Sequence, residues 1–174
     1  PPVANATAGT AALQRLIPAH LQAEHRGVKL LFLAANEPMA IHTVAPLRTI
    51  GELEGMRVGH TGRVIGATLR ALGAQPVTVM PLQVRAALAE GRIDAAAMTY
   101  EAALVVRLAE AARYSFELDA NTITFGLVMN AERYAALPEE LRRCVDDGLG
   151  TDAGACLAER LAQAAELGRE YMRE

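Results

Sequence analysis

The side chains that most often carry out chemistry do not form a catalytic pattern in this sequence. It contains no Gly-x-Ser-x-Gly, no His-Glu-x-x-His and no phosphate-binding Gly-x-x-x-x-Gly-Lys motif, and neither cysteine has a histidine nearby. His20 and His25 are five residues apart on one expected helix and point to different faces, which does not suit a metal site. His42 and His60 lie at the ends of expected strands, where a binding cleft would form, so both are candidates for ligand contact.

Two further polar or reactive features have structural explanations. Asp94 interrupts the apolar segment Gly91-Arg-Ile-Asp-Ala-Ala-Ala, so its carboxylate is expected to cap a neighbouring backbone group or to pair with an arginine. Cys144 and Cys156 are 12 residues apart in a stretch that reads as helix. They are too far apart to pair unless the chain folds back, and we expect them to be buried small hydrophobic side chains.

The elements that must position these residues follow from hydrophobic periodicity and from the glycines and prolines that end helices. A helix is expected over 7–25 with a break or kink at Pro18, and extended segments over 28–35 and 40–47. Strands then alternate with helices, and we expect strands over 56–59, 76–80 and 92–98 and helices over 63–72, 81–90 and 100–112. A β-rich stretch over 114–129 precedes a helical tail that the glycines near 148–154 interrupt.

Alternation of this kind predicts an α/β fold with a mostly parallel sheet flanked by helices. In such sheets a ligand binds outside the carboxyl ends of the strands. The residues at those ends are expected to be Gly59-His-Thr-Gly62, Met80-Pro81 and Met98-Thr-Tyr100.

Composition excludes several classes of protein. The chain has 174 residues, of which 52% are hydrophobic, and 17 basic against 20 acidic side chains give a formal net charge of -3. No overall positive field attracts phosphate backbones, so no nucleic-acid partner is expected. The apolar runs are well short of the roughly 20 residues that a membrane helix needs. The N-terminal residues lack the basic and apolar regions of a secretory signal, so any such signal is expected to be absent from this chain.

Five segments resemble, in order and spacing, the dicarboxylate-type (DctP-like) solute-binding proteins of tripartite ATP-independent periplasmic (TRAP) transporters. The matching segments are Gly27-Val-Lys-Leu-Leu, Pro46-Leu-Arg-Thr-Ile-Gly-Glu-Leu-Glu-Gly-Met-Arg-Val58, Leu72-Gly-Ala-Gln-Pro-Val77, Gln83-Val-Arg-Ala-Ala-Leu-Ala-Glu-Gly-Arg-Ile-Asp94 and Asn130-Ala-Glu-Arg-Tyr-Ala-Ala-Leu-Pro-Glu-Glu-Leu-Arg142. The resemblance covers about residues 28–149.

The resemblance implies a periplasmic-binding-protein-like (type II) two-lobed α/β fold that closes on its ligand about a hinge. Family members are about twice this long, so the first lobe is expected to be incomplete here. The implied division is 1–47 for the end of the first lobe and a crossover strand, 48–125 for the second lobe, and 126–174 for the return to the first lobe and the C-terminal helices. No catalysis and no cofactor are implied. The protein would bind a small organic solute in the periplasm and deliver it to the TRAP membrane subunits.

The residues that bind the ligand in that family are not all retained. An arginine after the family's Gly-Met-Lys-Ile sequence clamps the ligand carboxylate, and Gly59 occupies the matching position. Arg63 is the candidate substitute, and Arg57 is expected to point to the opposite side. The family's Glu-Asn pair is replaced by Ala97-Met98.

The candidate ligand-binding residues are those that remain around the expected cleft, and they suit a less acidic ligand with an aromatic or apolar part lying on Met98 and Tyr100. They are His42, His60, Thr61, Arg63, Met98, Thr99, Tyr100, Asn121, Thr122 and Thr124.

Two alternatives stay open on the residues alone. The same fold is used by some cytoplasmic enzymes and by the ligand-sensing domains of transcription regulators. An enzyme would need a nucleophile with an adjacent base, which the candidate residues do not offer. A regulator would need a helix-turn-helix before residue 1.

Overall fold

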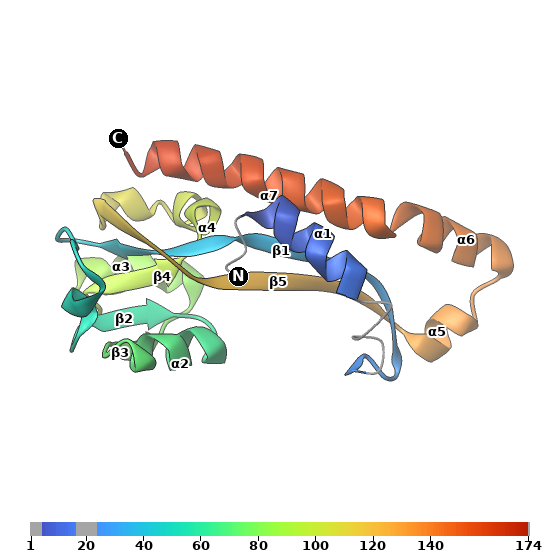
Figure 1. The fold of residues 1–174 in the computed structure, drawn as a ribbon, viewed down its shortest axis with the longest axis horizontal. Coiled ribbons are helices and arrows are strands. Elements are labelled where there is room, and N and C mark those ends of the chain that lie inside the picture. Colours follow the sequence, from blue (N-terminus) through green and yellow to red (C-terminus); the bar gives the residue numbers. More distant parts are fainter. Residues whose placement is uncertain (1–4, 17–23, 174) are drawn as a thin grey trace. The chain divides into compact units, whose positions relative to one another are not determined.

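The computed structural model describes residues 5–16 and 24–173 of the chain. Its strands are β1(Val28–Thr43), β2(Arg57–His60), β3(Gln75–Thr78), β4(Ala95–Met98) and β5(Tyr114–Asn130). The helices are α1(Ala6–Leu16), α2(Arg63–Ala71), α3(Val84–Ala89), α4(Tyr100–Val105), α5(Ala131–Ala135), α6(Glu139–Gly148) and α7(Thr151–Tyr171), with short 3-10 helices η3(Ile50–Leu53), η4(Pro81–Gln83) and η5(Leu108–Glu110) (Figure 1).

The described residues form two compact units. Unit 1 contains the described residues up to Glu37 together with Thr122–Ala162, and unit 2 contains Pro38–Asn121 together with the described residues from Gln163 onward. The chain passes from one unit to the other inside β1, β5 and α7. The division into lobes at residues 47 and 125 that the resemblance implies stays a prediction.

Unit 2 is built on the strands of a sheet with the order β3-β2-β4-β1-β5. Strand β2 runs parallel to both of its neighbours, β3 and β4, whereas β4 pairs antiparallel with β1 in a register that places Ala40 opposite Met98. Figure 1 shows β2, β3 and β4 together with α2 and α3. The α/β class is confirmed, and the parallel strands β2, β3 and β4 end at a common edge.

Helix α2 shows why this part of the sequence forms the expected element. Ile65 and Leu69 are buried, four residues apart on one face, while Arg63 and Arg70 are exposed. The helix ends before Gly73, which has a positive φ of 84° and whose N–H donates to the Arg70 carbonyl. The expected helix over 63–72 is therefore confirmed to within one residue.

In unit 1, α1 is attached to β1 by three hydrogen bonds along its length. The backbone N–H of Ala6 donates to Glu37 Oε1 at 2.9 Å, Ala35 N–H donates to Thr10 Oγ1 at 2.8 Å, and Gln14 Nε2 donates to the Leu33 carbonyl at 2.8 Å. The buried Glu37 carboxylate thus holds the first turn of α1, where a negative charge is favourable.

Some elements differ from expectation. The two extended segments over 28–35 and 40–47 are one continuous strand, β1, because the polar residues between them, Asn36 and Glu37, are buried and still extended. Of the expected helix over 7–25, the described residues up to Leu16 are helical in α1, and residues 17–23, which include His20, lie outside the described part of the chain. Among the described residues, no helix is both long and apolar enough to cross a bilayer.

Candidate functional site

A hollow of about 380 Å³ lies in unit 2 where β2 ends and α2 begins. We call it the β2–α2 hollow. Its lining residues are His60, Thr61, Gly62, Arg63, Gly66, Ala67, Arg70, Pro76 and Thr78. Three of the sequence-predicted site residues, His60, Thr61 and Arg63, are therefore brought together at the carboxyl ends of parallel strands.

The His60 ring is fixed by two neighbours. Its Nδ1 lies 2.9 Å from the Gly62 carbonyl oxygen, so Nδ1 carries the proton in the neutral ring and donates to that carbonyl. The ring lies against Gly66, where an added Cβ would come within 2.6 Å of His60 Cε1. A glycine at position 66 is what lets the ring approach α2 this closely.

Two arginines give the hollow its positive charge. Arg63 and Arg70 are seven residues apart on α2, so they lie on the same face of the helix. Both side chains are exposed, and neither has an ion partner among the described residues. The residue that caps the start of α2 is Gly62, which has no side chain to accept from the first N–H groups of the helix. Free N–H groups at a helix start, beside Arg63, suit a carboxylate or another small anion.

Arg70, Pro76 and Thr78 belong to the hollow but were not among the predicted site residues. Arg70 could have been predicted from the sequence, because it lies about two helical turns after Arg63 and therefore on the same face of α2. Pro76 and Thr78 are two residues apart on β3, so their side chains point to the same face of the strand.

His42 is enclosed by protein. Its ring is fully buried, with Nδ1 2.9 Å from Ser115 Oγ and Nε2 3.2 Å from the Met98 carbonyl oxygen. Burial lowers the pKa of His42 to about 4, so the ring is neutral near pH 7, with Nε2–H donating to the carbonyl. Both nitrogen atoms have protein partners, and contact with a ligand would require the ring to be uncovered.

The predicted residues at the end of β4 are also buried. Met98, Thr99 and Tyr100 are at most 6% exposed, and the Thr99 hydroxyl donates to Glu101. Tyr100 lies edge-on to His42, with ring centroids 5.2 Å apart, and burial raises the pKa of its hydroxyl. Tyr100 lines another cavity of unit 2 and not the β2–α2 hollow.

The three crossover residues are divided between the units. Asn121 belongs to unit 2, where its side-chain oxygen accepts from the Thr68 hydroxyl of α2 at 3.3 Å. Thr122 and Thr124 belong to unit 1, and Thr124 is exposed. Contact of these residues with a ligand stays a prediction.

The neighbours of β2 explain which arginine is available. Asp94 accepts from the Arg57 backbone N–H at 2.9 Å and from Arg57 Nε at 3.0 Å, and the guanidinium beside it lowers the carboxyl pKa. This confirms that Asp94 caps a backbone group and pairs with an arginine. At Gly59, an added Cβ would come within 2.7 Å of Ile93 Cδ1. The position of the family's clamp therefore faces the packed interior in this chain.

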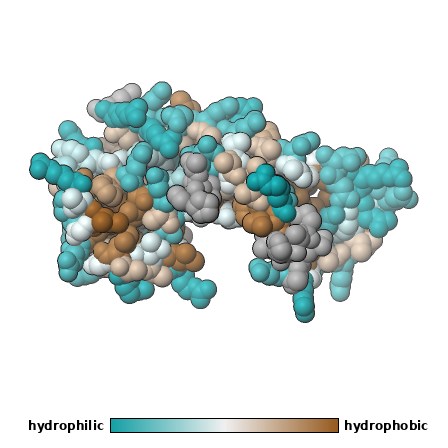
Figure 2. All heavy atoms as spheres, in the orientation of Figure 1, coloured by the Kyte–Doolittle hydropathy of each residue, from teal (hydrophilic) through white to brown (hydrophobic). Residues whose placement is uncertain are grey.

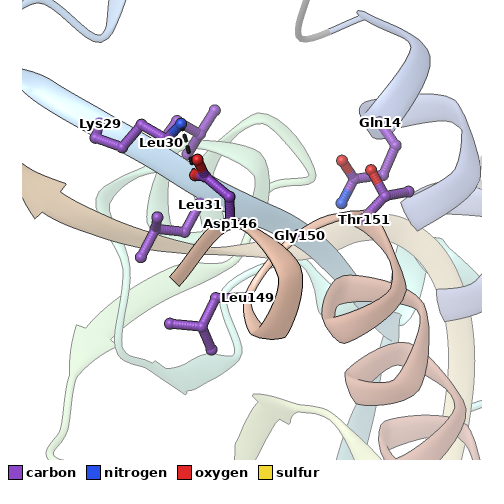
Figure 3. A pocket seen from close by; sticks show the side chains of 8 residues that line it. All are labelled: Gln14, Lys29, Leu30, Leu31, Asp146, Leu149, Gly150 and Thr151. Carbon is purple, nitrogen blue, oxygen red and sulfur yellow. Dashed lines mark ion pairs between the residues drawn. The ribbon is translucent and has the colours of Figure 1, made fainter. Parts of the chain in front are cut away.

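Unit 1 has a hollow of its own, of about 230 Å³, between β1 and the α6–α7 connection (Figure 3). Lys29, the sequence's only lysine, pairs there with Asp146 at 2.9 Å and lies over the Tyr134 ring at 4.5 Å. The Tyr134 hydroxyl also donates to Asp146, at 2.6 Å. The charges lining this hollow are therefore already paired, which makes it a weaker candidate than the β2–α2 hollow.

Metal binding finds no support in the described residues. They contain no group of three or more His, Cys, Asp and Glu side chains able to hold a metal ion. Cys144 and Cys156 are unpaired as expected, but both are exposed, so the expectation that they are buried is wrong. They lie on separate helices, α6 and α7.

Solved structures of solute-binding proteins are similar to this chain. A TRAP solute-binding protein from Rhodoferax ferrireducens, solved with copurified benzoate, is 27% identical with a TM-score of 0.86, and the match covers 98% of this chain and 55% of that one. A marine-metagenome TRAP protein specific for aromatic acid ligands is 24% identical (TM-score 0.85; 97% and 55% coverage), and one from Desulfovibrio salexigens is 23% identical (TM-score 0.85; 98% and 53% coverage).

This chain thus spans about 55% of the length of the solved proteins that it matches. The structures confirm the two-lobed, periplasmic-binding-like α/β fold class expected from the resemblance. The model of the bacterial extracellular solute-binding protein family 7 matches residues 5–173. The chain therefore belongs to that family, which is also called DctP.

Proposed function

We propose that this chain is part of an extracytoplasmic protein that binds a small organic acid and delivers it to a TRAP-type membrane permease. The observation that carries the proposal is the β2–α2 hollow, which is lined by His60, by Arg63 at the start of α2 and by Arg70 in its last turn, and neither arginine has an ion partner among the described residues. Membership of family 7 supports this reading over a cytoplasmic enzyme or regulator. Periplasmic location and the permease partner are part of the proposal.

In this proposal the ligand carboxylate lies at the start of α2. Arg63 supplies a planar fork that matches the two carboxylate oxygens, and the first N–H groups of α2 and the Thr61 hydroxyl supply further donors. Arg63 then replaces the clamp that the family places at the position of Gly59. The site binds and releases its ligand unchanged, because its lining contains no nucleophile with an adjacent base.

The rest of the ligand is apolar or aromatic. Val64 comes after β2 and Met80 after β3, the two strands whose ends line the hollow. Their side chains are 69% and 65% exposed. Figure 2 shows hydrophobic side chains at the surface of unit 2, at the left of the view. Apolar surface beside a cationic hollow suits an aryl carboxylate, and the copurified benzoate of the Rhodoferax ferrireducens protein supports this class.

Titration calorimetry of the purified protein with benzoate tests the proposal. Replacing Arg63 with glutamine removes the charge-assisted hydrogen bonds and is expected to weaken benzoate binding by about tenfold or more. Arg48→Gln is the matched control, since Arg48 is also exposed and lies in unit 2 but does not line the hollow. Equal affinity in wild type and R63Q would remove the Arg63 side chain from the site and overturn its role as the clamp.

A further inference from the structure

A second cavity of unit 2 shares no residue with the β2–α2 hollow. It has a volume of about 400 Å³ and lies where the start of α4, the start of β5 and the end of α7 meet. A smaller hollow of about 320 Å³ shares Arg113, Tyr114, Met172 and Arg173 with it. We call the two together the arginine cavity, because Arg113, Arg169 and Arg173 all line it.

One of the three arginines is held in place by other residues. Arg169 Nη1 lies 2.6 Å from Glu166 Oε1, and its Nε lies 3.7 Å from Glu117 Oε1. Its guanidinium also lies over the Tyr100 ring, 5.0 Å from the centroid, and its side chain is only 21% exposed. Arg169 is thus a fixed part of the cavity wall, and the Glu117 carboxylate pairs with it.

The other two arginines are available to a ligand. Arg113 and Arg173 are exposed, and neither has an ion partner among the residues that the structure describes. The charged lining residues are three arginines and Glu117, and with Glu166, which pairs with Arg169, an excess of one positive charge remains. This excess lies in a chain whose formal net charge is -3, so it is a local concentration of positive charge and not a general property of the surface.

The cavity is built on firmly positioned backbone. The Arg113 N–H donates to the Thr43 carbonyl at 3.1 Å, which fixes the start of β5. At Gly168, an added Cβ would come within 2.2 Å of the Tyr100 carbonyl oxygen, so the end of α7 packs directly on the start of α4. The Tyr100 hydroxyl donates to Glu117 at 3.3 Å and so joins the start of α4 to β5. The arginines therefore project from a pre-organised wall, which reduces the entropy lost on binding.

We propose that the arginine cavity is a second anion-binding site, which takes a small molecule or ion carrying a phosphate or carboxylate group. The planar guanidinium groups of Arg113 and Arg173 can each donate two parallel hydrogen bonds to such an oxyanion, and Tyr114 offers a ring beside them. This proposal does not depend on the β2–α2 hollow, since the two sites use different residues, and either can fail alone.

Calorimetry of the purified protein with inorganic phosphate, and separately with benzoate, tests this site. Arg113→Gln and Arg173→Gln are each expected to weaken binding of at least one of these anions by about tenfold, because each variant removes charge-assisted hydrogen bonds. Arg48→Gln removes the same charge elsewhere on unit 2 and should leave this binding unchanged. Weakening of phosphate binding would identify a phosphate-type site, and weakening of benzoate binding that R63Q does not share would identify a carboxylate-type site.

The inference is overturned if neither anion binds, or if R48Q weakens binding as much as the cavity variants do. Amide chemical shifts of the unaltered protein give a measurement that does not depend on the variants folding. Added phosphate or benzoate should shift the amides of Tyr114 and Arg173, and shifts spread evenly over the surface would also overturn the site.

Discussion

At the scale of single residues, His42 shows how strongly burial sets protonation in this protein. Its ring is fully enclosed and has the Ser115 hydroxyl and the Met98 carbonyl as partners. Desolvation lowers the pKa of His42 to about 4, although the hydrogen bond to Met98 acts in the opposite direction. The folded protein therefore holds this ring neutral at pH values where the unfolded chain binds a proton.

We predict that His42 makes stability fall as the pH falls. The contribution of His42 to the free energy of unfolding is fully present above the unfolded pKa of about 6.5. It is lost progressively as the pH falls towards about 4, because protons then bind the unfolded chain preferentially. Between about pH 7 and about pH 5 the loss from this one group is about 2 kcal/mol. Denaturant unfolding at the two pH values measures it.

His42→Gln is the control for that prediction, since glutamine keeps hydrogen-bonding capacity without titrating. Carboxylates that protonate in this range affect both proteins alike, so the difference between the two pH dependences belongs to position 42. Identical pH dependence in wild type and H42Q would contradict the assignment.

Two arginines close in sequence differ because only one has a fixed partner. Arg57 is held by Asp94 through its side chain and its backbone N–H, whereas Arg63 has no ion partner among the described residues. A ligand carboxylate competing for Arg57 would have to displace Asp94, while one binding Arg63 displaces only water. Residue type alone does not distinguish the two arginines. Whether an arginine is available to a ligand depends on whether a neighbouring carboxylate such as Asp94 already pairs with it.

At the scale of elements, the junction of β2 and α2 determines the shape of the candidate site. His60, at the end of β2, packs its ring on Gly66, one turn into α2, and hydrogen-bonds the Gly62 carbonyl between the two elements. A side chain at position 66 would occupy the place of the ring. The orientation of His60 thus depends on a glycine that makes no contact with a ligand itself.

We predict that Gly66→Ala displaces the His60 ring, which changes the shape of the hollow beside Arg63, and weakens benzoate binding by about tenfold. Alanine is a better helix former than glycine, so α2 itself is not weakened by the change. The histidine ring signals and a calorimetric titration report the two effects. Gly51→Ala is the control, because the nearest atom to its Cβ is 4.0 Å away. Unchanged binding in G66A would show that the His60 ring plays no part in recognition.

The elements were more predictable than the contacts. Local patterns and the glycines that end helices predict strand β2, helix α2 and strand β3. They also predict that His60, Thr61 and Arg63 lie together. The continuity of β1 through Asn36 and Glu37 did not follow, because the burial of polar residues depends on partners far along the chain, such as the Ala6 N–H.

Partners far along the chain also explain why some residues predicted to line the cleft are buried in the structure. His42 and Tyr100 occur beside expected strand ends, which made them candidates, but Ser115, Glu117 and Arg169 enclose them from distant parts of the chain. Pairing between elements distant in sequence is not contained in local periodicity.

At the scale of the whole molecule, the chain crosses between its two compact units three times, within β1, β5 and α7. Two of the crossings are made by strands and one by a helix. These three places are where we expect the hinge that the family resemblance implies. A ligand bound by the folded protein and not by the unfolded chain then stabilises the molecule by mass action.

We predict that benzoate stabilises the protein through Arg63. At a free concentration of about 100 times its dissociation constant, a ligand that binds only the folded state raises the free energy of unfolding by about 2.7 kcal/mol. Thermal unfolding should therefore shift upward with benzoate in wild type, and in R48Q by the same amount. In R63Q the shift at the same concentration should be smaller, because about tenfold weaker binding removes about 1.4 kcal/mol of that stabilisation. A shift of equal size in all three proteins would mean that benzoate stabilises the fold without Arg63, and the arginine cavity variants R113Q and R173Q would then show whether it binds at the second site.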